Sequence, residues 1–247
     1  MSQQYPDELE PPPVSENNIP PPGEPIFNLP AIIIGIAVFM VLVHALREWG
    51  LSRESDQWVI LVFSFIPARY SGAFAEFWPM AKFWSPFTYS VLHGNWMHLL
   101  VNLLWLAAFG SPVAARLGTA RTLVLAAVTS LGGAAAHWLA FQGEVVPMIG
   151  ASAVVSGFMG AATRFAFTGT RIRGKLNVHG PALSLWASLS NPNIAIFLIV
   201  WFGLNYLFGS GMVPLAGADM AIAWQAHVGG FLAGLLLFPL VDRKSST

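Results

Sequence analysis

Long apolar runs alternate with short polar segments along most of the chain. A helix needs about 20 predominantly apolar residues to cross a bilayer, so a run of that length bounded by charge, proline or glycine predicts a transmembrane helix. Such runs predict an all-α membrane protein with six transmembrane helices. The predicted spans are residues 30–46, 96–115, 122–141, 149–167, 193–208 and 220–241.

The segment between the first two predicted spans, about residues 50–95, is rich in aromatic residues but is broken by Pro67, Pro79 and Pro86. Aromatic rings with polar neighbours favour the headgroup region of a membrane. We therefore expect a long loop that lies in the interface and carries short amphipathic helices. A seventh span near residues 57–66 is the weaker alternative, because only about ten apolar residues are available there.

The two ends of the chain differ from this apolar middle. Residues 1–28 contain proline triplets at 11–13 and 20–22, which favour an extended conformation over a packed core. They do not resemble a secretory signal, because the first basic residue of the chain is Arg47. We expect a disordered Pro-rich tail at 1–28, a membrane domain at 29–242 and a short C-terminal tail at 243–247.

Charge and composition narrow the class of function. The chain is 55% hydrophobic and 10% charged, and its 12 basic and 12 acidic residues cancel, which argues against a nucleic-acid partner. Cysteine is absent, so covalent chemistry must use oxygen nucleophiles. Basic residues gather in loops on one side of a six-helix weave, and the positive-inside rule places that side and both termini in the cytoplasm, as in a cell inner (plasma) membrane. These residues are Arg116, Arg121, Arg164, Arg171, Arg173, Lys175, Arg243 and Lys244.

Polar groups inside an apolar span are costly unless they are paired or hydrated, so those that remain are candidates for function. His98 and Asn102 are four residues apart at the start of the second span and share one helical face. His93 lies about a turn earlier. Taken alone, this group fits a functional site and an interhelical hydrogen-bond pair equally well.

Ser152 follows Gly150 at the start of the fourth span. A serine in a membrane helix is usually a packing residue, and the nucleophile elbow of soluble hydrolases would need glycine where this chain has Val154. The setting of Ser152 is more informative. With Ser156 and Gly160 it forms a line of small residues at four-residue spacing, which allows a second helix to approach closely.

The sixth span supplies such a helix, because His227, Gly230 and Gly234 share one face. Docking of the two small-residue faces would bring the His227 imidazole toward the Ser152 hydroxyl. An imidazole within about 2.6–3.2 Å of a serine oxygen can take its proton. We therefore predict Ser152 as a nucleophile and His227 as its general base.

The other histidines are interpreted as interfacial or loop residues. They are His44, His137 and His179. A membrane di-iron oxidase is a rival class, because His93 and His98 could form one histidine box, but that chemistry needs several boxes and the chain has six histidines in all. We expect no metal and no cofactor.

These polar segments, in this order, resemble the rhomboid family of intramembrane serine proteases over most of residues 80–240. The resemblance implies a six-helix core and a Ser-His dyad that cleaves transmembrane segments of membrane-protein substrates within the lipid bilayer. By matching positions it implies Ser152 as nucleophile and His227 as base, with His98, Asn102 and the Ser152 N–H as oxyanion donors. The matching residues are Phe87, Thr88, Tyr89, His93, His98, Asn102, Arg116, Leu117, Gly118, Gly150, Ala151, Ser152, Ala226, His227, Gly230 and Gly234.

The chain departs from the family pattern at three positions. Ser85 follows Trp84 where many members have arginine, and Ala114 stands where many have glutamate. Both changes bear on packing more than on chemistry. Ser156 occupies a position that is aromatic in some members, so no ring from that position can stack under His227.

Two further expectations concern function. Substrate could enter beside the fifth span and the glycine-rich stretch 209–217, which would move as a gate. The alternative to a protease is a non-catalytic rhomboid-like protein that binds transmembrane clients. Such a protein would tolerate the loss of Ser152 or His227, and both are present.

Overall fold

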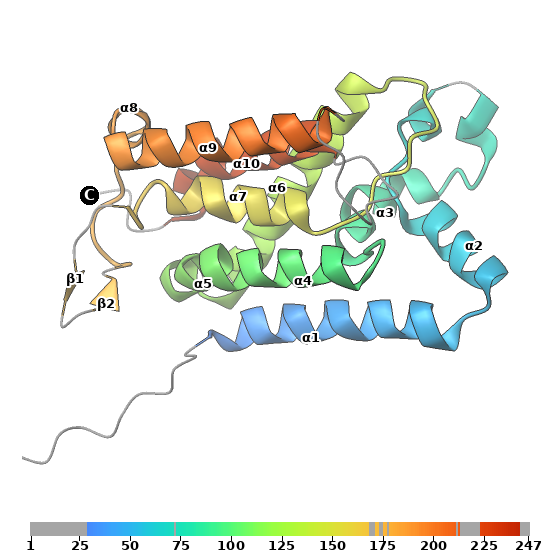
Figure 1. Cartoon of the computed structure of the whole chain (residues 1–247), viewed down its shortest axis with the longest axis horizontal. Coiled ribbons are helices and arrows are strands. Elements are labelled where there is room, and N and C mark those ends of the chain that lie inside the picture. The colour runs from blue at the N-terminus through green and yellow to red at the C-terminus, as the bar shows by residue number, and fades with distance from the viewer. Residues whose placement is uncertain are drawn as a thin grey trace, which may run out of the picture.

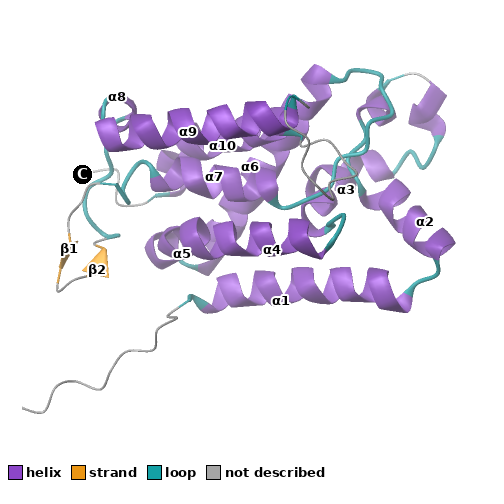
Figure 2. Cartoon of the chain, viewed as in Figure 1, coloured by secondary structure: helices purple, strands orange, loops and turns teal. Residues whose placement is uncertain are grey.

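The structure is a computed structural model that describes residues 29–71, 73–167, 171–172, 175–176, 178–210, 212 and 223–242. Helices dominate these residues, and the longest of them lie alongside one another (Figures 1 and 2). The predicted tails at 1–28 and 243–247, and most of the glycine-rich stretch 209–217, lie outside the described residues.

Five of the described helical segments are long and apolar enough to cross a membrane, which confirms the all-α membrane class. They coincide with five of the six predicted spans to within a few residues. The segments are α1 (Ala31–Ala45) continued by η2 (Leu46–Gly50); α4 (Trp96–Trp105), η6 (Leu106–Gly110) and α5 (Ser111–Leu117) in one run; α6 (Thr119–Ala140); α9 (Pro192–Gly209); and α10 (Trp224–Val241).

The predicted fourth span was too long. The helix there, α7 (Ser152–Ala162), has 11 residues and rises only about 16 Å, against about 30 Å of hydrocarbon in a bilayer. Nine of its residues are buried in the protein, and Figure 1 shows it between α4 and the pair α9 and α10. A helix enclosed by other helices is as apolar as one that faces lipid, so the hydrophobic run overstated its length.

The long loop that follows α1 folds into short helices. They are α2 (Arg53–Phe63), η3 (Pro67–Tyr70), η4 (Ala73–Glu76), α3 (Ala81–Thr88) and η5 (Tyr89–Val91). Phe65 and Met148 exchange backbone hydrogen bonds of 3.0 and 2.8 Å, which tie this loop to the strand-like segment just before α7. The position of the loop in a membrane interface stays a prediction.

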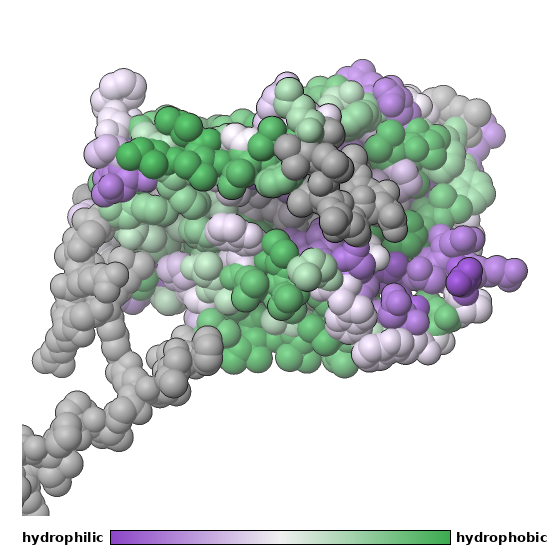
Figure 3. All heavy atoms as spheres, viewed as in Figure 1, coloured by the Kyte–Doolittle hydropathy of each residue, from purple (hydrophilic) through white to green (hydrophobic). Residues whose placement is uncertain are grey.

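The remaining described elements lie between α7 and α9. They are a short antiparallel hairpin, β1 (Arg171–Ile172) with β2 (Lys175–Leu176), and the helix α8 (Leu185–Leu189). On the face shown in Figure 3, apolar residues cover the helices, and hydrophilic residues gather toward the α2 end.

Helices α6, α7 and α10 meet through small residues. A Cβ added at Gly234 would lie 1.9 Å from the Gly157 carbonyl oxygen, and one added at Gly230 would lie 2.0 Å from the Ala153 oxygen. These distances leave no room for a side chain, so the backbones touch. The residue number rises by four on each helix from the first contact to the second, so α7 and α10 run parallel. The face of α7 that meets α10 is Ala153, Gly157 and Gly160, offset by one residue from the predicted line at Ser152 and Ser156.

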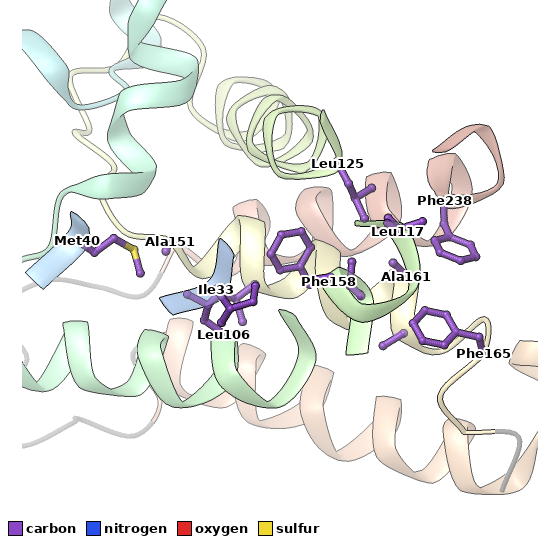
Figure 4. Packing of buried hydrophobic residues seen from close by; sticks show 14 of the residues in the cluster. Ile33, Met40, Leu106, Leu117, Leu125, Ala151, Phe158, Ala161, Phe165 and Phe238 are labelled. Atoms are coloured by element: carbon purple, nitrogen blue, oxygen red, sulfur yellow. The ribbon is translucent and has the colours of Figure 1, made fainter. Parts of the chain in front are cut away.

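Large side chains fill the space around this contact. Ile33 and Met40 of α1 pack with Leu106 and Phe158 in the largest buried cluster (Figure 4). At the other end of the cluster, Arg116 pairs with Asp242 at 2.7 Å, and both side chains are almost fully buried. This ion pair joins the end of α5 to the end of α10. The Arg116 guanidinium also lies 4.8 Å from the centre of the Phe165 ring.

The glycine contacts predict a stability difference. Gly234→Ala should lower the Tm by roughly 5 °C or more, because the new methyl group must displace the α7 backbone. Gly203→Ala in α9 is the matched control, since a Cβ there meets nothing within 4 Å. Thermal unfolding of the purified proteins in detergent measures both. Equal Tm values for the two variants would contradict this account of the packing.

Candidate active site

Ser152 is the first residue of α7 and is half-buried. Just before it, Gly150 has φ = 122°, a backbone conformation that residues with a side chain rarely adopt. The Gly150 N–H donates to the Tyr89 carbonyl at 2.9 Å, which anchors the turn. The N–H groups of the first turn of a helix have no partner within the helix, and the helix dipole is positive there. Ser152 thus stands at an end that favours a developing negative charge.

His227 lies in the first turn of α10, which begins at Trp224. Gly230 contacts Ala153, the second residue of α7, and His227 lies one turn before Gly230 on α10. His227 and Ser152 are therefore at the same end of two touching helices. In the described structure no hydrogen bond joins the Ser152 hydroxyl to the His227 ring.

His98 lies in the first turn of α4, where the Asn95 side chain caps its N–H at 2.8 Å. The Gly94 N–H donates to His98 Nδ1 at 3.4 Å, so in the neutral ring Nε2 carries the proton. A Cβ added at Gly150 would lie 2.7 Å from His98 Nε2 and 3.7 Å from Ser152 Oγ. His98 Nε2 and Ser152 Oγ therefore both lie close to the position that a Gly150 Cβ would take, so a donor and a hydroxyl are near each other at this turn.

Asn102 is buried one turn further along α4 and donates from Nδ2 to the His98 carbonyl at 2.8 Å. This bond uses one of its two amide hydrogens. The structure thus places Asn102 beside His98, and its described hydrogen bond goes to the backbone there rather than to Ser152 or His227.

His93 is completely buried in the loop before α4. Its Nε2 accepts from the Ala151 N–H at 3.4 Å, and its ring meets that of His98 edge to face at 5.2 Å. Burial, with a smaller effect of the nearby His98, lowers the pKa of His93 to about 3. The ring is therefore neutral at ordinary pH and supports the turn before Ser152 as an acceptor.

Sequence reasoning missed Arg47, which is hydrogen-bonded to the loop that carries His93. Its Nη1 donates to the His93 carbonyl at 2.8 Å, and its Nε pairs with Asp56 at 2.7 Å. One guanidinium thus connects the end of the first helix, α2 and the loop that carries His93.

Sequence reasoning also missed Asn205 in α9. Its Oδ1 is hydrogen-bonded to His227 Nδ1, and its Nδ2 donates to the Trp201 carbonyl at 2.8 Å. The Trp201 ring lies 6.5 Å from the His227 ring. An amide in the interior of an apolar span was a usable signal, by the same rule that singled out His98 and Asn102.

The chain therefore has a buried helix that begins at a serine, a parallel neighbour that carries a histidine, and a second histidine across the turn. Residues 80–244 match the family model for the Rhomboid domain. This match covers more than half of the chain, so the chain belongs to the rhomboid family.

Two relatives are the Rhomboid protease GlpG proteins of Pectobacterium atrosepticum and Serratia proteamaculans. The first is 32% identical over 158 residues, which are 63% of this chain and 48% of that protein. The second is 29% identical over 158 residues, which are 63% of this chain and 47% of that protein. The chain thus spans about half the length of these relatives.

The low pKa of His93 predicts a loss of stability in acid. The unfolded ring has a pKa of about 6.5, so His93 stabilises the fold fully above about pH 6.5, and that stabilisation is lost as the pH falls toward 3. The Tm of His93→Gln should therefore fall less than the Tm of the wild type when the pH is lowered from about 7 to about 4. Thermal unfolding in detergent across this range tests it, and parallel Tm curves for the two proteins would exclude His93 as a source of acid sensitivity.

Proposed function

We propose that this chain is an intramembrane serine endopeptidase that cleaves transmembrane segments of membrane-protein substrates. The observation that carries the proposal is the contact of Gly230 with the Ala153 backbone, which puts Ser152 and His227 at the same end of parallel helices. His227 accepts the Ser152 proton as the serine oxygen attacks a peptide carbonyl. His227 gives this proton to the leaving amine as the peptide bond breaks, and water then hydrolyses the acyl-enzyme to release the new carboxylate and restore Ser152.

His98 is proposed to donate to the oxyanion from Nε2, together with the Ser152 N–H and Asn102. The hydrogen bond from Gly94 to His98 Nδ1 supports this role, because it leaves the proton on Nε2 beside Gly150. Asn102 is on the same side of α4 and retains a second amide hydrogen. Each oxyanion donor can contribute about 3 kcal/mol to the stability of the transition state.

Substrate is proposed to reach this site beside α9. Among the described residues of α9 only Ile194 and Leu198 are buried, so much of the helix faces outward, and a shift of α9 that keeps its contacts with His227 and Phe231 would open a route beside it. A membrane-embedded substrate needs such a lateral route, because its own helix lies in the lipid bilayer. The protein would lie in a cell inner membrane with both termini cytoplasmic, as the basic loops indicate.

Ser152→Ala should abolish cleavage of a helix-destabilised transmembrane reporter, by at least about 10³-fold in kcat, because the nucleophile is removed. Ser156→Ala is the matched control one turn along α7, since the Ser156 hydroxyl donates to the Ser152 carbonyl. It should keep most activity. Gel assays with purified protein in proteoliposomes measure both. If Ser152→Ala cleaves the reporter as fast as the wild type, Ser152 is not the nucleophile. If the wild-type protein binds the reporter without cleaving it, the chain is better described as a client-binding protein.

Asn102→Ala should lower kcat by about 10²-fold through loss of an oxyanion donor, with a small change in Tm. Labelling of Ser152 by a fluorophosphonate probe supplies a second readout that needs no substrate helix, and it should disappear in His227→Ala. A folded Asn102→Ala protein with full turnover would show that Asn102 only packs α4.

A further inference from the structure

Asn205 is a polar side chain in a helix that is otherwise apolar over most of its length. The α9 segment has a mean hydropathy of 1.5 and is long enough to span a membrane. An amide in such a helix is costly unless both its donor and its acceptor are used. In Asn205 both are used, by the Trp201 carbonyl and by His227.

The partners of Asn205 determine which way its amide faces. A backbone carbonyl only accepts, so the atom that lies 2.8 Å from the Trp201 oxygen must be the Nδ2 donor. The carbonyl Oδ1 is then the atom that meets His227. A flip of the amide would set two oxygens against each other at Trp201, and an N–H would face the ring at His227.

This orientation determines the tautomer of His227. Because Oδ1 can only accept, His227 Nδ1 must carry the hydrogen of the bond. A neutral imidazole has one N–H, so Nε2 is left with a free lone pair. That form can accept a proton from a serine, whereas the opposite tautomer cannot.

We propose that Asn205 is a positioning residue that keeps His227 in the tautomer and ring orientation in which Nε2 can accept the Ser152 proton. The inference rests on the proposed function of Ser152 and His227. It assigns to α9 a part in the chemistry besides its part in substrate entry. An uncharged acceptor suits this place, because a carboxylate in an apolar span would carry a large desolvation cost.

Two substitutions separate this role from packing. Asn205→Leu keeps a similar size and removes the acceptor, while Asn205→Asp keeps an acceptor for His227. Leu204→Ala is the control, since Leu204 is the neighbouring residue on the exposed side of α9. The readouts are kcat and KM for the reporter in proteoliposomes, and the rate at which a small fluorophosphonate labels Ser152. His98, the other histidine close to Ser152, is unchanged in every variant.

Asn205→Leu should lower both kcat and the labelling rate by about 10- to 100-fold, with KM changed less than about threefold, because proton acceptance by His227 is impaired. Asn205→Asp should recover much of this loss. It should also move the acid limb of the kcat profile to higher pH, because a carboxylate favours the protonated ring. Leu204→Ala should match the wild type.

Unchanged kcat and labelling in Asn205→Leu would overturn the inference. So would slow cleavage with normal labelling, because that pattern places the effect in substrate passage along α9. If Asn205→Leu does not fold, Asn205→Asp decides, and an unaltered pH profile in that variant counts against the role. Cleavage by Ser152→Ala would instead overturn the proposed function itself, so the two failures are distinct.

Discussion

The backbone contact between α7 and α10 is the constraint on which the rest of the structure depends. Gly230 and Gly234 let α10 lie directly on the carbonyls of Ala153 and Gly157. The contact encloses α7 in the protein and sets the register of the two helices. Since Ser152 and His227 occupy the first turns of these helices, the same contact holds the two residues of the proposed dyad at one end of the pair. A methyl group at either glycine would alter the packing and the site at once.

Much of the fold could be predicted from the sequence because a bilayer imposes a local requirement on each span. Five spans follow from the length of their apolar runs alone. The exception was α7, whose apolar pattern reflects burial against other helices, and hydropathy does not distinguish that environment from lipid. The line of small residues on α7 was also displaced by one position, because spacing identifies a face only to within about a residue.

Some residues of the candidate site could be predicted from the sequence and others could not, for a physical reason. Ser152 was singled out by the line of small residues that begins at it, whereas His98, Asn102 and His227 could be singled out because a polar group in an apolar span is conspicuous in the sequence. Asn205 met the same criterion, but recognising its importance required knowing that α9 lies beside α10. Arg47 could not have been found this way. Its partners are a carboxylate and a loop carbonyl, and the path of an irregular loop leaves no periodic pattern in the sequence.

The shortness of α7 has a consequence for where in a membrane a peptide bond could be cut. The helix rises about 16 Å from Ser152 to Ala162, roughly half the thickness of the hydrocarbon layer. With the Arg164 end of α7 near one membrane face, a nucleophile at Ser152 would lie roughly 14 Å below the other face. The depth of Ser152 in the bilayer would then determine the level at which a substrate is cut. A transmembrane segment cut by the proposed chemistry would have to unwind at that level.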